Sequence, residues 1–397
     1  MRRCEVFRLP TAHPADVGAL LALIGSGRIR AHDIRAILGK TEGNGCVNDF
    51  TRAYALSALR TALSDPLACH PDHVGDRIAM VMSGGTEGGL SPHLLVFTET
   101  ESAPVAHPAG TLATAKSPTG KPPTGKPPIG KSLAIGKAAT RALRPEEIGR
   151  ISQIKATAEA VTTAMTQADI TRGEDVHYVQ VKCPLLTAER VAQAAARGHT
   201  VATADAYKSM AVSRGASALG VALALKEISP DALDDTAVCR RLDLWSGRAS
   251  ASAGIELMHN EVIVLGNSPS WASDAVIAHR VMRDAIDLPA ASAALADAGL
   301  AVSDLAVTGQ LDQQAADHLL AVLAKADPAT SGQIRGARHI MLDDSDINAT
   351  RHARALVGGV LAGLTGRTDL FVSGGAEHQG PDGGGPIAVI VRRQVSR

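Results

Sequence analysis

The sequence of 397 residues predicts an α/β protein that consists of three copies of one unit. The first observation is a five-residue element, Ser-small-Gly-x-Glu, which begins at Ser83, at Ser252 and again at Ser373. The second is that a lysine, and then an arginine preceded by a hydroxyl residue, comes before each of these serines. Three polar residue types that recur in one order in three segments indicate internal repetition.

Each lysine ends or follows a short apolar run, and each arginine opens a stretch of small residues. The pairs are Lys40 and Arg52 in the first copy, Lys182 and Arg214 in the second, and Lys325 and Arg351 in the third. A single lysine at a strand end is usually a solvated charge, but the threefold repetition favours a functional set. The middle copy differs most, because Ala253 stands where the other copies have Gly84 and Gly374.

Hydrophobic periodicity predicts about four strands and two helices in each unit. The first unit has strands at 5–9, 34–38, 77–82 and 94–97, with helices at 14–24 and from 52 onward. The second has strands at 133–138, 176–181 and 261–265, with helices at 145–168 and 216–226. The third has strands at 275–281, 369–372 and 387–391, a segment ending at 325, and helices at 289–298 and 352–361. Glycines directly after a strand let the backbone approach a ligand closely.

The predicted units span residues 1–103, 132–268 and 273–397, and residues 104–131 between the first two have a different character. From 116 to 131 this segment repeats Lys, Pro, Thr or Ile and Gly with a period of five residues. Such a composition cannot form a packed core. We therefore expect a solvated, extended linker.

Composition excludes several classes of function. Lys plus Arg and Asp plus Glu both number 40, so no basic excess indicates a nucleic acid or anionic lipid partner. Aromatic residues are only 2%, which leaves few platforms for stacked bases. No apolar run approaches the roughly 20 residues that span a bilayer. Five cysteines without paired spacing predict no disulfide framework, which indicates a cytoplasmic protein.

Four long motifs resemble the ring-opening amidohydrolases, the family of cyanuric acid hydrolase and barbiturase. They are GKTEGNGCVND at 39–49, VQVKCPLL at 179–186, SRGASALG at 213–220 and SGGAEHQGP at 373–381. The resemblance covers the chain apart from the Lys-Pro-Pro segment. It implies three homologous units around a pseudo-threefold axis, with the sheets inside as a barrel-like core and the helices outside. It also implies one active site where the units meet, and a homo-oligomer, expected to be a tetramer.

The resemblance implies hydrolytic opening of the s-triazine ring of cyanuric acid to carboxybiuret, which then gives biuret and CO2. The implied nucleophile is Ser252 and its base is Lys182, with Ser250 as a nearby competitor. A lysine can act as base only when it is neutral, so burial and nearby arginines must lower its pKa from about 10.4. The implied substrate-binding set is Arg52, Ser83, Gly84, Arg214, Ser252, Ala253, Arg351, Ser373, Gly374, Lys40 and Lys325.

The resemblance also implies a structural divalent cation, Mg2+ or Ca2+, and no organic cofactor. Its ligands would be oxygens, which suit such hard ions. They would come from Asp327, Ala376, Gln379, Gly380, Pro381 and Gly384. The family has Glu at the position of Asp327, whose shorter side chain would weaken the site or recruit a water. No His/Cys spacing typical of zinc is present.

Three alternatives remain open at this level. A barbiturase would act on a ring with one methylene, and we would expect one unit to depart from the repeated set. A non-catalytic binder of a triazine or pyrimidine anion would use the same cradle without needing a neutral lysine. A structural repeat protein would not cluster Lys and Arg. Cys46 and Cys183 lie near the motif lysines, but small apolar filling is the more common role of such cysteines.

Overall fold

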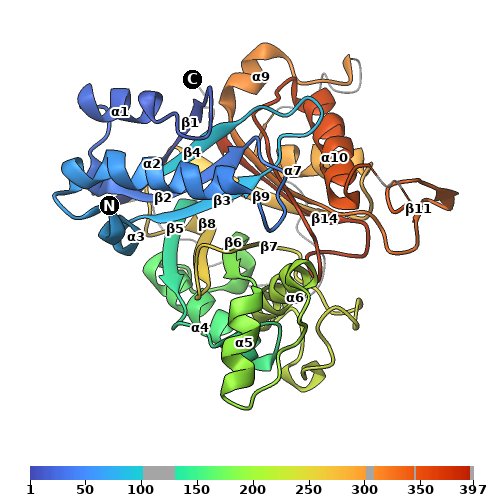
Figure 1. Ribbon diagram of the computed structural model, residues 1–397. Helices are drawn as coiled ribbons and strands as arrows, with labels where there is room; N and C mark the ends of the chain where they lie inside the picture. The colour runs from blue at the N-terminus through green and yellow to red at the C-terminus, as the bar shows by residue number, and fades with distance from the viewer. Residues whose placement is uncertain (102–129, 301–307, 344–345, 394–397) are drawn as a thin grey trace.

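The computed structural model describes residues 1–101, 130–300, 308–343 and 346–393, and it contains three four-stranded sheets of the same topology (Figure 1). The predicted linker at 104–131 lies outside the described residues except for its last two positions. In each sheet the first strand of the unit pairs with the fourth, the fourth with the second, and the second with the third. The prediction of three similar α/β units is therefore confirmed.

The first unit, shown in blue in Figure 1, contains the sheet β1-β4-β2-β3. Its elements are β1 (Arg2–Pro10), α1 (Gly18–Gly25), β2 (Ile34–Thr41), α2 (Phe50–Leu67), α3 (Val74–Arg77), β3 (Ala79–Gly84) and β4 (His93–Glu101). Helix α2 begins after Asp49, whose side chain accepts a hydrogen bond from the backbone N–H of Thr51. A carboxylate in this position satisfies an N–H group that has no partner within the helix.

The second unit, shown in green to yellow, contains the sheet β5-β8-β6-β7. Its elements are β5 (Ser132–Ala139), α4 (Ile151–Gln167), β6 (Val176–Pro184), α5 (Ala188–Ala196), α6 (Ala206–Ala224), β7 (Ala249–Gly254) and β8 (Glu261–Ser268). The sequence predicted neither β7 nor α5, and it predicted the start of α6 ten residues too late. Strand β7 consists only of Ala, Ser and Gly, which carry no strong strand signal.

The third unit, in orange to red, contains the sheet β9-β14-β10-β13. Its elements are β9 (Ala275–Met282), α7 (Leu288–Asp297), α9 (Gln313–His318), β10 (Leu319–Ala326), β11 (Gln333–Ile334), β12 (Ala337–Arg338), α10 (Ala349–Thr365), β13 (Phe371–Gly374) and β14 (Gly385–Arg392). The strands β11 and β12 form a separate two-stranded hairpin. No helix in the described part of the chain is both long and apolar enough to cross a membrane.

The sheets of the three units pack against one another, and the helices lie on their outer sides (Figure 1). One apolar cluster draws buried residues from all three sheets, among them Leu38, Val181 and Leu323. Separate clusters lie between the sheet and the helices of the first and third units. Within the described residues the sheets are not hydrogen-bonded to one another as one closed barrel, so the predicted barrel-like core is wrong in that respect.

The alternation of side chains along the central strands determines which residues reach the junction of the units. On β2, Ala36 and Leu38 belong to the shared apolar cluster, whereas Ile37 packs into the cluster of the first unit alone. Because successive strand residues point to opposite faces, Lys40 lies on the same face as Leu38. The lysine is thus placed at the end of a strand and on the side shared by all three units.

Candidate functional site

The predicted lysine and serine of each unit are direct neighbours on two parallel strands. Lys40 pairs with Ser83 in the register of β2 and β3. Lys182 and Ser252 occupy the same positions on β6 and β7, as do Lys325 and Ser373 on β10 and β13. All six side chains are buried. The repeated sequence pattern therefore corresponds to a repeated geometric pair.

The three lysines also connect the units in cyclic order. Lys40 Nζ donates to the carbonyl of Val372 at 2.8 Å, Lys182 Nζ to Met82 at 2.9 Å, and Lys325 Nζ to Ala251 at 2.9 Å. Each accepting carbonyl belongs to the residue immediately before the serine of another unit. These contacts bring the three strand ends together at one place.

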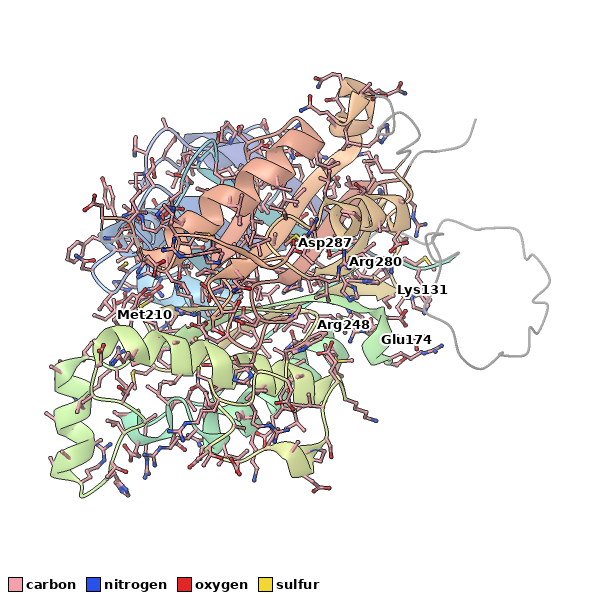
Figure 2. All side chains as sticks on the ribbon, turned by 90° about the vertical axis from the view of Figure 1, so that its right-hand side faces the viewer. Lys131, Glu174, Met210, Arg248, Arg280 and Asp287 are labelled. Carbon is pink, nitrogen blue, oxygen red and sulfur yellow. The ribbon has the colours of Figure 1, made fainter. Side chains whose placement is uncertain are left out.

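A small space of about 20 Å³ lies between the ends of these strands. It is lined by Gly45, Arg52, Ser83, Gly84, Met210, Arg214, Ser252, Ala253, Arg354, Ser373 and Gly374. Figure 2 shows Met210 on the side of α6 that faces the other two units. We refer to this space as the ring pocket. The structure thus gathers all three predicted serines, the residue after each, and two of the three predicted arginines.

The third arginine of the ring pocket is Arg354 and not the predicted Arg351. The Arg354 side chain is 5% exposed and forms an ion pair with Glu87, whereas that of Arg351 is 38% exposed and reaches the same carboxylate at 3.3 Å. The pattern of a hydroxyl residue followed by arginine pointed to Arg351, which does not line the pocket. The signal that identifies Arg354 is its helical spacing from the buried Val357 and Leu361 on α10.

The glutamates of the repeated pentapeptides have different partners. Glu87 pairs with Arg354 of the third unit, and Glu377 pairs with Arg214 of the second unit. Glu256 instead pairs with Lys182 of its own unit, at 2.9 Å between Oε1 and Nζ. The middle unit therefore departs from the symmetry of the other two.

Arg52 has contacts unlike those of the other two ring-pocket arginines. It lies 3.7 Å from the carboxylate of Asp49 and donates to the carbonyls of Ala253 and Cys46 at 3.0 and 2.7 Å. The carboxylate that pairs with Arg52 thus comes from the start of the same helix, and Glu256 pairs with Lys182 instead.

The three serine hydroxyls also differ in their contacts. Ser83 Oγ lies 3.4 Å from Lys40 Nζ, Ser373 Oγ lies 3.3 Å from Lys325 Nζ, and the two hydroxyls are 3.3 Å apart. Ser252 Oγ is buried and has no hydrogen-bond partner among the described residues. The competing Ser250 does not line the ring pocket. A buried polar group without a partner is costly, and such groups occur at ligand sites.

Burial lowers the pKa of every lysine at this junction, because a low-dielectric environment disfavours the charged form. For Lys182 burial is the largest cause, the carboxylate of Glu256 opposes it, and Arg52 adds to the lowering. Burial and Arg214 lower the pKa of Lys325 to about 7. Burial and Arg354 place the pKa of Lys40 well below its usual range. The site thus holds lysines that can exist as neutral bases near neutral pH.

The thiol of Cys183 is not suited to act as a nucleophile. Burial raises its pKa, and its Sγ lies 3.6 Å from the carbonyl oxygen of Ser252. Because the thiolate is the reactive form, a raised pKa makes this cysteine inert. The side chain fills apolar space, as the sequence favoured.

The loop predicted to hold a cation lies beside Asp327. The two carboxylate oxygens of Asp327 accept hydrogen bonds from the Ala376 N–H and the Thr350 hydroxyl, both at 3.0 Å. Burial is the largest cause that raises the pKa of Asp327, and the negative charge of the nearby Glu377 raises it further. The Gln379 Oε1 accepts from the Ala251 N–H at 2.7 Å, which leaves one lone pair of this oxygen for a metal.

These residues fit a cation held mainly by carbonyl groups. The described part of the chain contains no group of three or more His, Cys, Asp or Glu side chains that could hold a metal. A buried carboxylate whose charged form is disfavoured is a place where a cation would be stabilising. The predicted set of one carboxylate, one amide and several backbone oxygens is therefore consistent with the geometry.

The chain is similar to several cyanuric acid amidohydrolases over nearly its full length. That of Ectopseudomonas oleovorans is 54% identical over 390 residues, which cover 98% of this chain and 99% of the relative. That of Azorhizobium caulinodans is 51% identical over 392 residues, which cover 98% of this chain and 99% of the relative.

Two solved structures have the same fold as this chain. A cyanuric acid hydrolase described as an evolutionary innovation by structural concatenation matches with a TM-score of 0.88 and 47% identity, and the match covers 99% of this chain and 100% of that chain. A cyanuric acid hydrolase from A. caulinodans matches with a TM-score of 0.85 and 49% identity over the whole of both chains.

The family model described as amidohydrolase ring-opening protein matches residues 5–392. This range includes all four motifs that carried the resemblance and every residue of the ring pocket. The chain therefore belongs to the ring-opening amidohydrolase family.

Proposed function

We propose that this protein is a cyanuric acid amidohydrolase, which opens the s-triazine ring of cyanuric acid by hydrolysis. The names of its relatives support this substrate. The observation that carries the proposal is the ring pocket, where an arginine and a serine from each unit surround one small space. Cyanuric acid is a flat ring with three equivalent carbonyl groups. We infer a pseudo-threefold axis through the pocket, so that each unit binds one carbonyl with a charge-assisted hydrogen bond.

The nucleophile in this proposal is Ser252, because its hydroxyl is the one of the three without a hydrogen-bond partner in the described structure. Neutral Lys182 takes the Ser252 proton while Oγ bonds to a ring carbonyl carbon. The nearby arginines and backbone N–H groups stabilise the oxyanion. The ammonium of Lys182 then protonates the ring nitrogen as the C–N bond breaks. Water releases carboxybiuret, which loses CO2 to give biuret.

Turnover of cyanuric acid and barbituric acid by the purified protein tests the proposal. We expect kcat/KM to be at least about 100-fold higher for cyanuric acid, since a site built for three polar ring edges is left with unpaired groups by a methylene. The loss of ultraviolet absorbance measures turnover of each substrate. A preference for barbituric acid would make the protein a barbiturase, and tight binding of cyanuric acid without turnover would make it a binder.

The two neighbouring arginines of α10 give a matched pair of variants. We expect Arg354→Ala to lower kcat/KM for cyanuric acid by about 100-fold or more, because it removes a charged donor from the ring pocket. Arg351→Ala should lower it by less than about threefold, because this exposed side chain does not line the pocket. Steady-state kinetics of both variants, with their melting temperatures, provides the measurement. The reverse order of effects would restore Arg351 as the third cradle arginine.

We also propose a structural Mg2+ or Ca2+ bound by Asp327, Gln379 and the carbonyls of the loop from Ala376 to Gly384, including those of Gly380 and Pro381. When bound, the cation would stabilise the loop that follows Ser373. Because a ligand that binds only the folded state raises its stability, EDTA should lower the melting temperature, and added Mg2+ or Ca2+ should restore it.

The variant Asp327→Asn should abolish this response to EDTA, whereas Asp343→Asn, which removes an exposed carboxylate paired with Arg338, should retain it. Metal analysis of the purified protein by mass spectrometry gives an independent readout. An unchanged melting temperature in EDTA, together with no bound metal, would contradict the site.

For the assembly we propose a cytoplasmic homotetramer of 40.9 kDa chains. All five cysteines are free thiols in the structure, which supports a reducing compartment. Light scattering coupled to size exclusion measures the mass of the assembly in solution.

A further inference from the structure

The ion pair of Lys182 with Glu256 has no counterpart in the other two units. Lys40 and Lys325 donate to serine and carbonyl oxygens and form no ion pair within 4.0 Å among the described residues. The glutamates equivalent to Glu256 pair with arginines instead. The unit with the free serine hydroxyl is thus also the unit in which a carboxylate contacts the lysine.

A large cavity lies between the first and second units, and both members of this ion pair line it. Its volume is about 740 Å³, and its lining includes Lys182, Glu256, His259 and Glu261. None of the residues that line this cavity lines the ring pocket. Lys182 thus lines this cavity while its strand neighbour Ser252 lines the ring pocket, and we refer to the larger space as the junction cavity.

The two members of the ion pair differ in their access to the junction cavity. The Lys182 side chain is 2% exposed, whereas that of Glu256 is 15% exposed. His259 and Glu261 line the same cavity, and His259 Nε2 lies 3.4 Å from Glu261 Oε2. Besides burial, the charge of Arg52 lowers the pKa of Lys182, and Cys183 opposes this lowering. Against burial, Lys182 and Arg52 lower the pKa of Glu256, which in turn opposes the lowering of the Arg190 pKa by burial. Among these groups, Glu256 is the carboxylate in contact with the Lys182 ammonium.

The proposed reaction requires a group that can take a proton from Lys182 before Ser252 attacks the ring. A carboxylate at 2.9 Å favours the ammonium form of Lys182, and an ammonium ion cannot accept a proton from Ser252. The proton must therefore leave Lys182 before the attack and return after product release. A carboxylate in direct contact provides a place for it without exchange through the substrate space.

We propose, resting on the function proposed above, that Glu256 stores the Lys182 proton during each turnover and exchanges it with water in the junction cavity. The proton first moves from Lys182 Nζ to Glu256 Oε1, which leaves an amine and a carboxylic acid. The amine then takes the Ser252 proton as the Oγ–C bond forms and gives it to the ring nitrogen as the C–N bond breaks. In the water step the same amine takes a proton from the attacking water and gives it to Ser252 Oγ as the acyl C–O bond breaks, and the stored proton finally returns to Lys182. Glu256 is thus a positioning residue that acts through Lys182.

The variant Glu256→Gln tests this role, because it keeps the shape of the side chain and removes its ability to hold a proton. Transfer within the pair conserves bound protons, so the kcat of the wild type should change little between about pH 6 and 9. In the variant Lys182 must lose its proton to solvent. Loss of the Glu256 charge lowers the pKa of Lys182 further, and kcat should fall by about tenfold for each pH unit below that pKa and recover as the pH rises, while KM changes by less than about threefold.

Sodium formate provides a second readout, since the small formate anion can enter the junction cavity and accept the proton in place of the Glu256 carboxylate. Because glutamine still fills the place of the carboxylate, the rescue is measured in the truncated variant Glu256→Ala, whose kcat formate should raise at the acid end while the wild type stays unchanged. Gly75→Met should prevent this rescue, because Gly75 lines the cavity and an added Cβ meets only Arg60, at 3.5 Å. The control Glu174→Gln removes an ion pair with Arg172 in which both side chains are exposed, and it should behave as wild type.

Each outcome either supports or overturns the proposed role of Glu256 as a proton store. An equal loss of kcat at all pH values without formate rescue would mean that Glu256 has only a structural role, and wild-type kinetics in the variant would also overturn the inference. If Glu256→Gln fails to fold, the pH profile of the wild type decides: a kcat that rises about tenfold per pH unit between about pH 6 and 8 would show that Lys182 loses its proton to solvent, and it would overturn the inference. Absence of cyanuric acid turnover in the wild type would instead overturn the proposed function, which keeps the two failures distinguishable.

Discussion

Replacement of Ser252 by alanine is expected to lower kcat for cyanuric acid by at least about 1,000-fold and to leave binding of the ring largely intact. The hydroxyl is the attacking group, and loss of a nucleophile removes the covalent route as a whole. Binding should persist because the three arginines and the other two serines still line the ring pocket. Stopped-flow kinetics gives kcat, and calorimetric titration with cyanuric acid gives the dissociation constant of the inactive variant.

The variants Ser83→Ala and Ser373→Ala are matched controls for this result. Their hydroxyls already contact lysines and each other, so their loss should weaken binding or positioning by about 10- to 100-fold. Retention of most activity in Ser252→Ala, with complete loss in one of the other two, would transfer the nucleophile to that unit. Mass spectrometry of protein quenched during turnover should detect an adduct on the peptide that contains Ser252.

Lys182→Arg is expected to reduce kcat to a similar extent, by about 1,000-fold or more. Arginine keeps the positive charge and the ion pair with Glu256 but cannot be deprotonated in a protein, so it cannot serve as base. If the lysine acted only as a fixed positive charge, this substitution would be mild. The comparison therefore separates proton transfer from electrostatic stabilisation.

The measurement is kcat at several pH values, with the melting temperature as a check on folding of the larger side chain. Lys208→Arg, an exposed position on α6, should behave as wild type. Activity of Lys182→Arg within about tenfold of the wild type would exclude Lys182 as the base. Lys325, whose pKa is lowered to about 7, would then become the candidate.

The sequence predicted the lysine and serine pairs because their recurrence is independent of the surrounding structure. Residues of one type at equivalent repeat positions, such as Lys40 and Lys325, must occupy equivalent places if the units fold alike. The strand β7 was missed because its residues are all small and buried, and Ala, Ser and Gly have little strand propensity of their own. In that segment only the repeat indicated a strand, through Ser252 and the residues that follow it.

The third arginine and the role of Glu256 depend on geometry that repetition cannot give. Arg351 and Arg354 are one helical turn apart, and the rotation of α10 against the sheet decides which of them is buried. The pentapeptide glutamates look equivalent in sequence. Their partners differ because Asp49, at the start of α2, lies beside Arg52, and Glu256 contacts Lys182 instead. Such exchanges of partner are visible only when all the units are in place.

The cyclic set of lysine-to-carbonyl contacts has a consequence for how the gene could be rearranged. Each unit donates a hydrogen bond from its lysine to one neighbour and receives one from the other, so an isolated unit would expose a buried lysine and a carbonyl without its donor. A rearranged gene must preserve the order in which the three units contact one another around the pocket. The point at which the polypeptide begins is arbitrary, and a circular permutant that starts with the second unit would contain the same closed set of contacts.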